Sequence, residues 1–178
     1  MAASAENHAM SSRTQTILMT FTPVALVLST IGEATSTYIG NASKSVPVGL
    51  YQLQPVGRLA VTELVAVRPP EPLATFLDLN GYLPIGVPML KRVLALPGQT
   101  LCRKGLTISV DGIDMGAALS SDSRGRPLPV WQGCHAVELD ELFLMNWQSE
   151  DSLDGGYFGF IPNPSVIGKA LPVWTREE

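Results

Sequence analysis

Histidine and cysteine are scarce in this chain, and the common nucleotide-binding motifs are missing. Two histidines and two cysteines among 178 residues do not fit the usual zinc motifs and cannot build a disulfide framework. Neither GxxxxGK[ST] nor GxGxxG occurs. The chemistry is therefore expected to come from Ser, Lys, Asp or Glu side chains, with no cofactor and no metal ion.

Charged residues are also few, and positive charge is not concentrated anywhere. Lys and Arg number 12 against 16 Asp and Glu, so the net charge is −4, and there is no basic run that would favour nucleic-acid binding. A composition of 46% apolar and 16% charged residues argues against disorder. The length suits one domain with an appendage rather than two domains.

The appendage is the N-terminal part of the chain. Residues 1–16 are small and polar, and an apolar run of fifteen residues follows at 17–31. At about 1.5 Å per residue the run spans roughly 22 Å, less than a hydrocarbon core of about 30 Å. A buried core helix, a signal-peptide core and a membrane anchor all remain open. We favour an uncleaved anchor over 17–39, because candidate catalytic residues follow at once, and Arg13 places residues 1–16 in the cytoplasm.

Residues 40–178 are predicted to form a mainly β domain. Segments rich in Val, Leu and Ile are separated by Gly, Pro and Asp. Asp111-Gly112 predicts a two-residue hairpin turn. Pro72 and Gly81 are placed to begin and end one short helix. The expected strands are 49–54, 59–67, 87–96, 106–110, 136–145 and 166–174.

A nucleophile needs a base, and histidine is a poor candidate for that base here. His8 precedes the apolar run, and no GxSxG elbow supports a triad with His135. His135, next to Cys134 and far from other candidate ligands, is more simply explained as structural.

A neutral lysine is the alternative base, and it requires an apolar site that lowers its pKa. Lys44 and Lys104 lie in polar surroundings, and none of the four lysines has a serine three residues before it, which excludes SxxK. Lys91 is the first choice and Lys169 the second. In an extended strand the Lys91 side chain shares a face with three apolar residues, Met89, Val93 and Ala95.

Three stretches of the domain together resemble a known family. Residues 43–51 (SKSVPVGLY) are similar to the nucleophile box of the Ser/Lys signal peptidases, in the form found in TraF-type conjugative-transfer peptidases. Residues 91–98 (KRVLALPG) resemble the lysine box of this family, and residues 151–159 (DSLDGGYFG) resemble its C-terminal box. Three boxes in the same order cover most of the chain after Gly40.

The resemblance implies a signal-peptidase-like antiparallel β catalytic domain on an N-terminal membrane-anchor helix. Carried over to this sequence, Ser45 is the nucleophile and Lys91 the general base. The Ser45 amide and the Ser43 hydroxyl form the oxyanion hole, and Ser152 orients the lysine. Asp154 is the acidic residue of TraF-type members, and we expect it to act at one remove, because a carboxylate beside Lys91 would raise the pKa of the lysine.

The boxes also depart from the wider family. Housekeeping signal peptidases carry Met and one further residue before the proline, where Val46 leads directly to Pro47. Their last box has Ser-Arg in place of Gly155-Gly156, so a possible partner of the preceding carboxylate is missing. Many relatives also have Asp where this chain has Gln99.

Each residue has a purely structural alternative. Ser43 and Ser45 could form a side-chain-capped turn. Lys91 could be an edge-strand lysine that discourages aggregation. Asp154 before two glycines could be only a turn.

Cys102 and Cys134 lie 32 residues apart, outside any CxxC spacing. In a cytosolic protein they would be two buried thiols. TraF-type relatives often show a similar pair, so the resemblance implies a disulfide, worth roughly 3.7 kcal/mol in the chain-entropy model.

The predicted function is that of a serine endopeptidase anchored in the bacterial inner membrane, with its catalytic domain on the periplasmic side. The resemblance implies that its partner is a conjugative pilin precursor or another membrane-bound preprotein, cleaved after small residues. The acyl group could pass to water or to the pilin's own N-terminus, which would close a ring. The alternatives are a secondary type I signal peptidase for exported preproteins and a catalytically silent assembly factor of the conjugation channel. A cytosolic self-cleaving repressor is disfavoured, because there is no DNA-binding segment.

Overall fold

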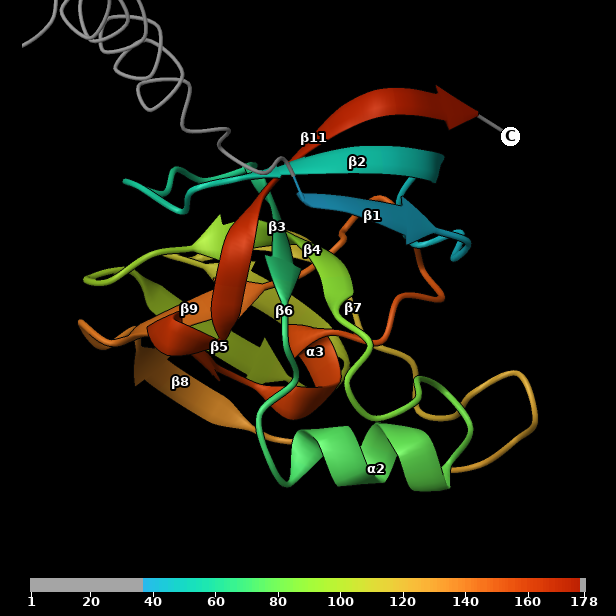
Figure 1. Ribbon diagram of the computed structural model, residues 1–178. Coiled ribbons are helices and arrows are strands. Elements are labelled where there is room, and N and C mark those ends of the chain that lie inside the picture. The colour runs from blue at the N-terminus through green and yellow to red at the C-terminus, as the bar shows by residue number, and fades with distance from the viewer. Residues whose placement is uncertain (1–36, 177–178) are drawn as a thin grey trace, which may run out of the picture. The chain divides into compact units, whose positions relative to one another are not determined.

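The computed structural model describes residues 37–176 (Figure 1). The predicted cytoplasmic segment 1–16 and most of the predicted anchor 17–39 lie outside this range. The described chain begins directly with a strand, so residues 37–39 belong to the β domain. Between residues 37 and 176, no helix is long and apolar enough to cross a membrane.

A seven-stranded antiparallel sheet forms the larger part of the domain, in the order β1-β2-β11-β3-β4-β9-β10. In Figure 1, β1, β2 and β11 lie together at one end of the domain and helix α2 lies at the opposite end. The β4 strand is central, paired with β3 on one side and β9 on the other. The strands are β1 (Thr37–Asn41), β2 (Val48–Gln54), β3 (Leu64–Val67), β4 (Met89–Ala95), β9 (Glu141–Leu144), β10 (Ile161–Pro162) and β11 (Val166–Arg176).

A second antiparallel sheet has four strands in the order β7-β6-β5-β8. These are β5 (Thr100–Lys104), β6 (Thr107–Val110), β7 (Ile113–Ala117) and β8 (Gly133–Ala136). The helical segments are α2 (Leu73–Leu79), α3 (Gly155–Phe158) and the 3₁₀ turn η1 (Asn163–Ser165). The predicted fold class, a mainly β antiparallel domain, is confirmed.

Local sequence signals are confirmed where turn chemistry decides the backbone. The β6–β7 hairpin turns at Asp111 and Gly112, with φ of 50° and 81°. Two consecutive positive φ values are what a type I′ turn requires. Helix α2 follows Pro72 and ends before Gly81, which has φ of 68°.

Two predicted strands were too long. Within 59–67 only Leu64–Val67 is extended, because Ala60 donates its amide to the Glu63 carboxylate and Thr62 adopts φ of 78°. The segment 136–145 is divided between β8 and β9 by a turn in which the Glu141 amide donates to the Glu138 carbonyl. Strands β1 and β5 were not predicted, because their exposed and polar positions weaken the apolar pattern.

The core consists of several clusters, and two of them flank β4. One cluster packs β3, β4 and β9 against α2, and a second joins β4 and β9 to the smaller sheet. Met89 and Val93 belong to the first, as the alternation predicts, but Ala95 belongs to the second. The pairing of β4 with β9 shifts register between Val93 and Ala95, and this irregularity moves Ala95 off the shared face.

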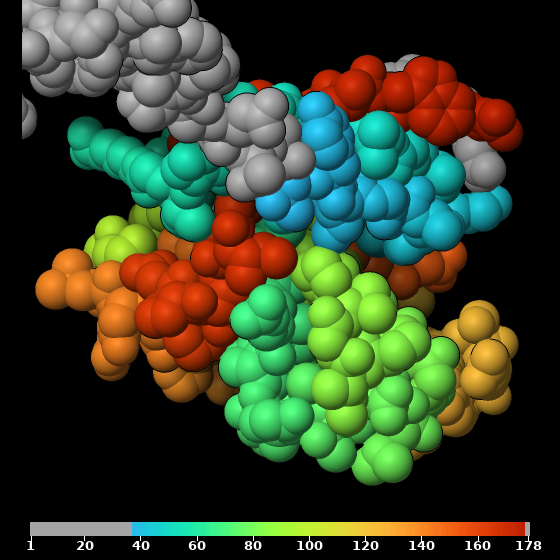
Figure 2. All heavy atoms as spheres, in the orientation of Figure 1, coloured from blue at the N-terminus to red at the C-terminus, as the bar shows by residue number. Residues whose placement is uncertain are grey.

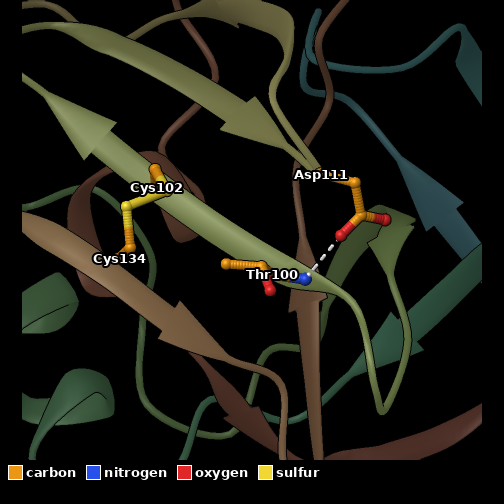
Figure 3. The surroundings of a disulfide bond; sticks show 4 residues. All are labelled: Thr100, Cys102, Asp111 and Cys134. Atoms are coloured by element: carbon orange, nitrogen blue, oxygen red, sulfur yellow. Dashed lines mark hydrogen bonds between the residues drawn. A yellow bond between two sulfur atoms is a disulfide. The ribbon is translucent and has the colours of Figure 1, made fainter.

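A disulfide between Cys102 and Cys134 cross-links β5 to β8 (Figure 3). The two cysteines are direct partners in the strand register. At the start of β5, Thr100 donates its amide to the Asp111 carboxylate over 2.7 Å, which ties this strand to the β6–β7 turn. The bridge therefore reinforces the smaller sheet.

Candidate active site

Ser45 lies in the turn between β1 and β2, and the side chain of Asn41 organises this turn. The Asn41 amide donates to the carbonyls of Ser43 over 2.7 Å and Val46 over 3.0 Å, and its oxygen accepts from the Ser43 amide over 3.1 Å. This Asx turn was not predicted as part of the site. The signal was present in the sequence, as an asparagine two residues before the first serine of the nucleophile box.

The two serines of the turn contact each other. The Ser45 amide donates to Ser43 Oγ over 3.2 Å, and the two hydroxyl oxygens are 2.9 Å apart. Ser45 is half-buried and Ser43 exposed. The two groups expected to form an oxyanion hole thus bond to each other and lie beside Ser45 Oγ.

Close backbone packing supports the same turn from the β2 side. At Gly49, φ is 159°, and a Cβ built there would lie 2.1 Å from the Trp174 carbonyl of β11. Only glycine allows β11 to approach β2 this closely. This explains the glycine in the nucleophile box, four residues after Ser45.

Lys91 projects from the central strand β4 and is only 5% exposed. Its Nζ donates to Ser152 Oγ over 2.7 Å. Burial lowers the pKa of Lys91 from 10.5 to about 8, although the nearby Asp154 carboxylate acts in the opposite direction. The edge-strand explanation is wrong, because β4 is paired on both sides. The lowered pKa means that a substantial fraction of Lys91 is neutral at mildly alkaline pH.

Asp154 is also 5% exposed, and its carboxylate caps helix α3. One oxygen accepts from the Gly156 amide and the other from the Asn146 amide, each over 3.0 Å. Burial raises the pKa of Asp154, while Lys91, the two amides and the Ser152 hydroxyl oppose that rise. The carboxylate thus holds the chain on both sides of Ser152 and influences Lys91 electrostatically.

The glycine pair after Asp154 has a steric explanation. A Cβ at Gly155 would lie 2.7 Å from the Leu144 carbonyl and 2.8 Å from the Phe143 ring, so this position has no room for a side chain. An arginine does reach the turn, but from β5. The guanidinium of Arg103, which is fully buried, donates to the Gly156 carbonyl.

Asn146 is a second site residue that was not predicted from the sequence. Its side chain is 1% exposed, accepts from the Arg92 amide over 3.0 Å and donates to the Leu90 carbonyl over 3.1 Å. The side chain therefore bonds to the backbone of β4 on both sides of Lys91, while the Asn146 backbone amide donates to the Asp154 carboxylate. An isolated asparagine after an apolar strand carries no recognisable motif.

A cleft of about 440 Å³ brings the predicted residues together. Ser43, Ser45, Lys91 and Ser152 all line it, whereas Asp154 is not part of its lining. Figure 2 shows this face, with the blue atoms of β1 above the green to yellow-green atoms of α2 and the segment that follows it. Much of the remaining lining is apolar: Leu77, Tyr82, Leu83, Val87, Met89 and Leu153.

The other base candidates lie elsewhere. Lys169 forms an ion pair with Glu63 at 2.7 Å and donates to the Arg58 carbonyl, and it lines a different cavity. The His135 ring lies edge-on to Trp131, with centroids 6.0 Å apart. Across residues 37–176, no group of three or more His, Cys, Asp or Glu side chains is placed to hold a metal ion.

A family model and several curated relatives point to the same family of proteins. A family model described as signal peptidase, peptidase S26, matches residues 10–175. The probable conjugal transfer protein TraF of Sinorhizobium fredii is 31% identical over 164 residues, which cover 84% of this chain and 86% of that protein. The conjugal transfer protein TraF of Agrobacterium fabrum is 36% identical over 149 residues, covering 78% and 82%. A solved signal peptidase I from Enterococcus faecalis is 19% identical with a TM-score of 0.39, covering 64% of this chain and 97% of that one.

Proposed function

The chain belongs to the signal peptidase family, peptidase S26, as a TraF-type member, and on this premise we propose that it is a serine endopeptidase with Ser45 and Lys91 as its catalytic dyad. The observation that carries the proposal is the environment of Lys91. Lys91 is buried, it donates a hydrogen bond to the Ser152 hydroxyl, and its pKa is lowered to about 8. It lines the same cleft as the nucleophile candidate, Ser45. A structural lysine needs none of these features.

The chemistry proceeds through an acyl-enzyme. Neutral Lys91 takes the proton from Ser45 Oγ as that oxygen attacks the scissile carbonyl. The Ser45 amide and the Ser43 hydroxyl stabilise the oxyanion, and the Lys91 ammonium then protonates the leaving amine. Ser152 accepts a hydrogen bond from Nζ throughout and thereby keeps its orientation. Water attacks the ester after Lys91 removes its proton, and Ser45 is released with that proton.

The proposed substrate is a conjugative pilin precursor, cleaved after small residues at the periplasmic face of the inner membrane. The TraF names of the relatives support a role in conjugation, and the apolar run at 17–31 supports a membrane anchor. An amine at the pilin's own N-terminus could replace water in the second step, and this would give a cyclic product. The family description also supports the alternative substrate, an exported preprotein.

The test uses purified full-length chain with a candidate pilin precursor, followed by mass spectrometry. Hydrolysis gives the mass of the cleaved chain, and cyclisation gives a product lighter by one water. Ser45→Ala is expected to be inactive because it lacks the nucleophile. Lys91→Arg is expected to be inactive because a guanidinium group does not deprotonate in this pH range. Lys169→Arg, which keeps a surface ion pair, serves as the folded and active control.

Two outcomes would count against the proposal. Wild-type cleavage by Ser45→Ala would exclude this nucleophile, and full activity of Lys91→Arg would turn attention to Lys169. Cleavage of an exported preprotein but not of pilin would favour the signal peptidase alternative. A chain that cleaves neither substrate would favour the silent assembly factor.

The location is tested separately. A reporter that is active only in the periplasm, fused after Glu178, is expected to be active, and the protein is expected to fractionate with membranes. Cytosolic activity of the fusion would contradict both the anchor and the periplasmic site.

A further inference from the structure

A second cleft, of about 470 Å³, also contains Ser45 in its lining. Its charged lining is entirely cationic, with Lys44, Arg92 and Arg176, and its further polar side chains include Gln148 and Ser149. No acidic side chain among residues 37–176 lines it. This composition is unexpected for a chain with a net charge of −4, and it concentrates positive potential beside the nucleophile.

The two clefts share Ser45 but differ in chemistry. The charged lining of the first cleft is mixed, with Lys91 and Asp151 beside several apolar side chains, whereas the charged lining of the second is cationic. A peptide whose scissile carbonyl lies at Ser45 extends away from it in two directions. With the acyl part in the first cleft, beside Lys91, the segment that leaves with the amine faces the cationic cleft.

The two arginines differ in how they lie in this cleft. Arg92 is half-buried, its Nη1 donates to the Thr62 carbonyl over 3.0 Å, and its Nε is buried without a hydrogen-bond partner within the described part of the chain. Arg176 is exposed at the end of β11, and its guanidinium lies 5.8 Å from the centre of the Trp174 ring. Guanidinium groups bind carboxylates through paired N–H donors, which is the chemistry this surface offers.

We propose that the cleft formed by Arg92 and Arg176 binds a carboxylate in the leaving segment of the substrate. The carboxylate is either an acidic side chain or the C-terminus of a short leaving segment. This inference rests on the proposed function, since it assumes that peptide bonds are cleaved at Ser45. It adds a selection for negative charge in the segment after the scissile bond.

The test compares three short peptides that share an alanine-rich acyl part and a leaving segment of the same length. One has a neutral segment with a C-terminal amide, one adds a glutamate to it, and one keeps the neutral segment with a free C-terminal carboxylate. We expect kcat/KM of one or both carboxylate peptides to exceed that of the neutral one by roughly two- to fivefold per ion pair. The form that gains identifies the source of the carboxylate. The advantage is expected to fall in 1 M NaCl, where the screening length is about 3 Å.

Charge variants connect the preference to the cleft. Arg176→Gln and Arg92→Gln are each expected to reduce the ratio of carboxylate to neutral kcat/KM. Lys104→Gln removes the same charge from the exposed end of β5 and is expected to leave the ratio unchanged. Equal ratios in wild type and both arginine variants overturn the proposal.

Binding to full-length Ser45→Ala, measured by fluorescence anisotropy with the same peptides, separates the two hypotheses. If wild type cleaves all three peptides equally, the carboxylate site is wrong while the peptidase assignment stands. If wild type cleaves none but Ser45→Ala binds the carboxylate forms more tightly, the peptidase assignment fails and the site stands. If there is no preference in either assay, the carboxylate site is excluded.

Discussion

Lys91→Met is expected to make the protein more stable at neutral pH while removing its activity. Methionine keeps the length of the side chain and removes a charge that is buried in wild type. The central position of β4 leaves this charge little access to water, so the folded state carries a cost that the unfolded chain does not.

The magnitude follows from the pKa of Lys91. The drop from 10.5 in the unfolded chain to about 8 in the folded protein corresponds to about 3 kcal/mol. Below pH 8 both states are protonated and the folded state bears the whole cost. Between pH 8 and 10.5 the unfolded chain binds a proton that the folded protein lacks, so wild-type stability rises with pH by about 1.4 kcal/mol per pH unit. Loss of the hydrogen bond to Ser152 offsets about 1 kcal/mol of the gain in the variant.

The assay is urea unfolding of wild type and Lys91→Met at several pH values, followed by the fluorescence of the three tryptophans. The variant is expected to be about 2 kcal/mol more stable at pH 7. That advantage should shrink from pH 8 upwards, reverse near about pH 9.5 and level off above pH 10.5, where the lysine is neutral in both states. Lys104→Met, at an exposed position, is the control and is expected to change stability by less than about 0.5 kcal/mol.

A difference between the two proteins that does not change with pH would refute the reasoning, because it would mean that folding leaves the titration of Lys91 unaltered. A Lys91→Met protein that is less stable than wild type at pH 7 would show that the ammonium is well solvated or fully paired. Either result would remove the physical basis for a neutral lysine base.

Three further predictions concern the oxyanion donor, the capping carboxylate and the disulfide. Ser43→Ala should fold normally and lower kcat by roughly 10²–10³, and a loss below threefold in steady-state kinetics would exclude Ser43 as an oxyanion donor. The pH–rate profile should rise to a plateau with a midpoint near the Lys91 pKa of about 8. Asp154→Asn should move that midpoint to lower pH, because the carboxylate raises the lysine pKa, and an unmoved midpoint would contradict this coupling. Replacing Cys102 and Cys134 by serine should cost roughly 3.7 kcal/mol in urea unfolding with little effect on kcat, and two titratable thiols in the denatured, unreduced wild type would show that the bridge does not form.

The elements that could be predicted from the sequence are those set by neighbouring residues. The hairpin at Asp111-Gly112 and the helix between Pro72 and Gly81 depend on local backbone preferences, and both are present. Lys91 was singled out because alternating apolar residues surround it in a strand, and it is buried as expected. The prediction failed where a local turn interrupted an apolar segment, as at 59–63, since hydrophobicity alone does not report a side chain that bonds to the backbone.

The site itself depends on contacts between distant parts of the chain. Ser152 meets Lys91 across 61 positions, and Asn146 grips the strand that carries Lys91 across 54 and 56. Arg103 reaches the turn after Asp154 from the smaller sheet.

The sequence by itself determined several of the extended segments and which residues could carry the chemistry, because side-chain period and turn residues act over a few positions. Only the tertiary structure decided how far the pKa of Lys91 falls and that Ser45 opens onto two clefts of different charge. Burial and electrostatic potential depend on everything that packs around a group, and strand pairing determines those neighbours over long separations.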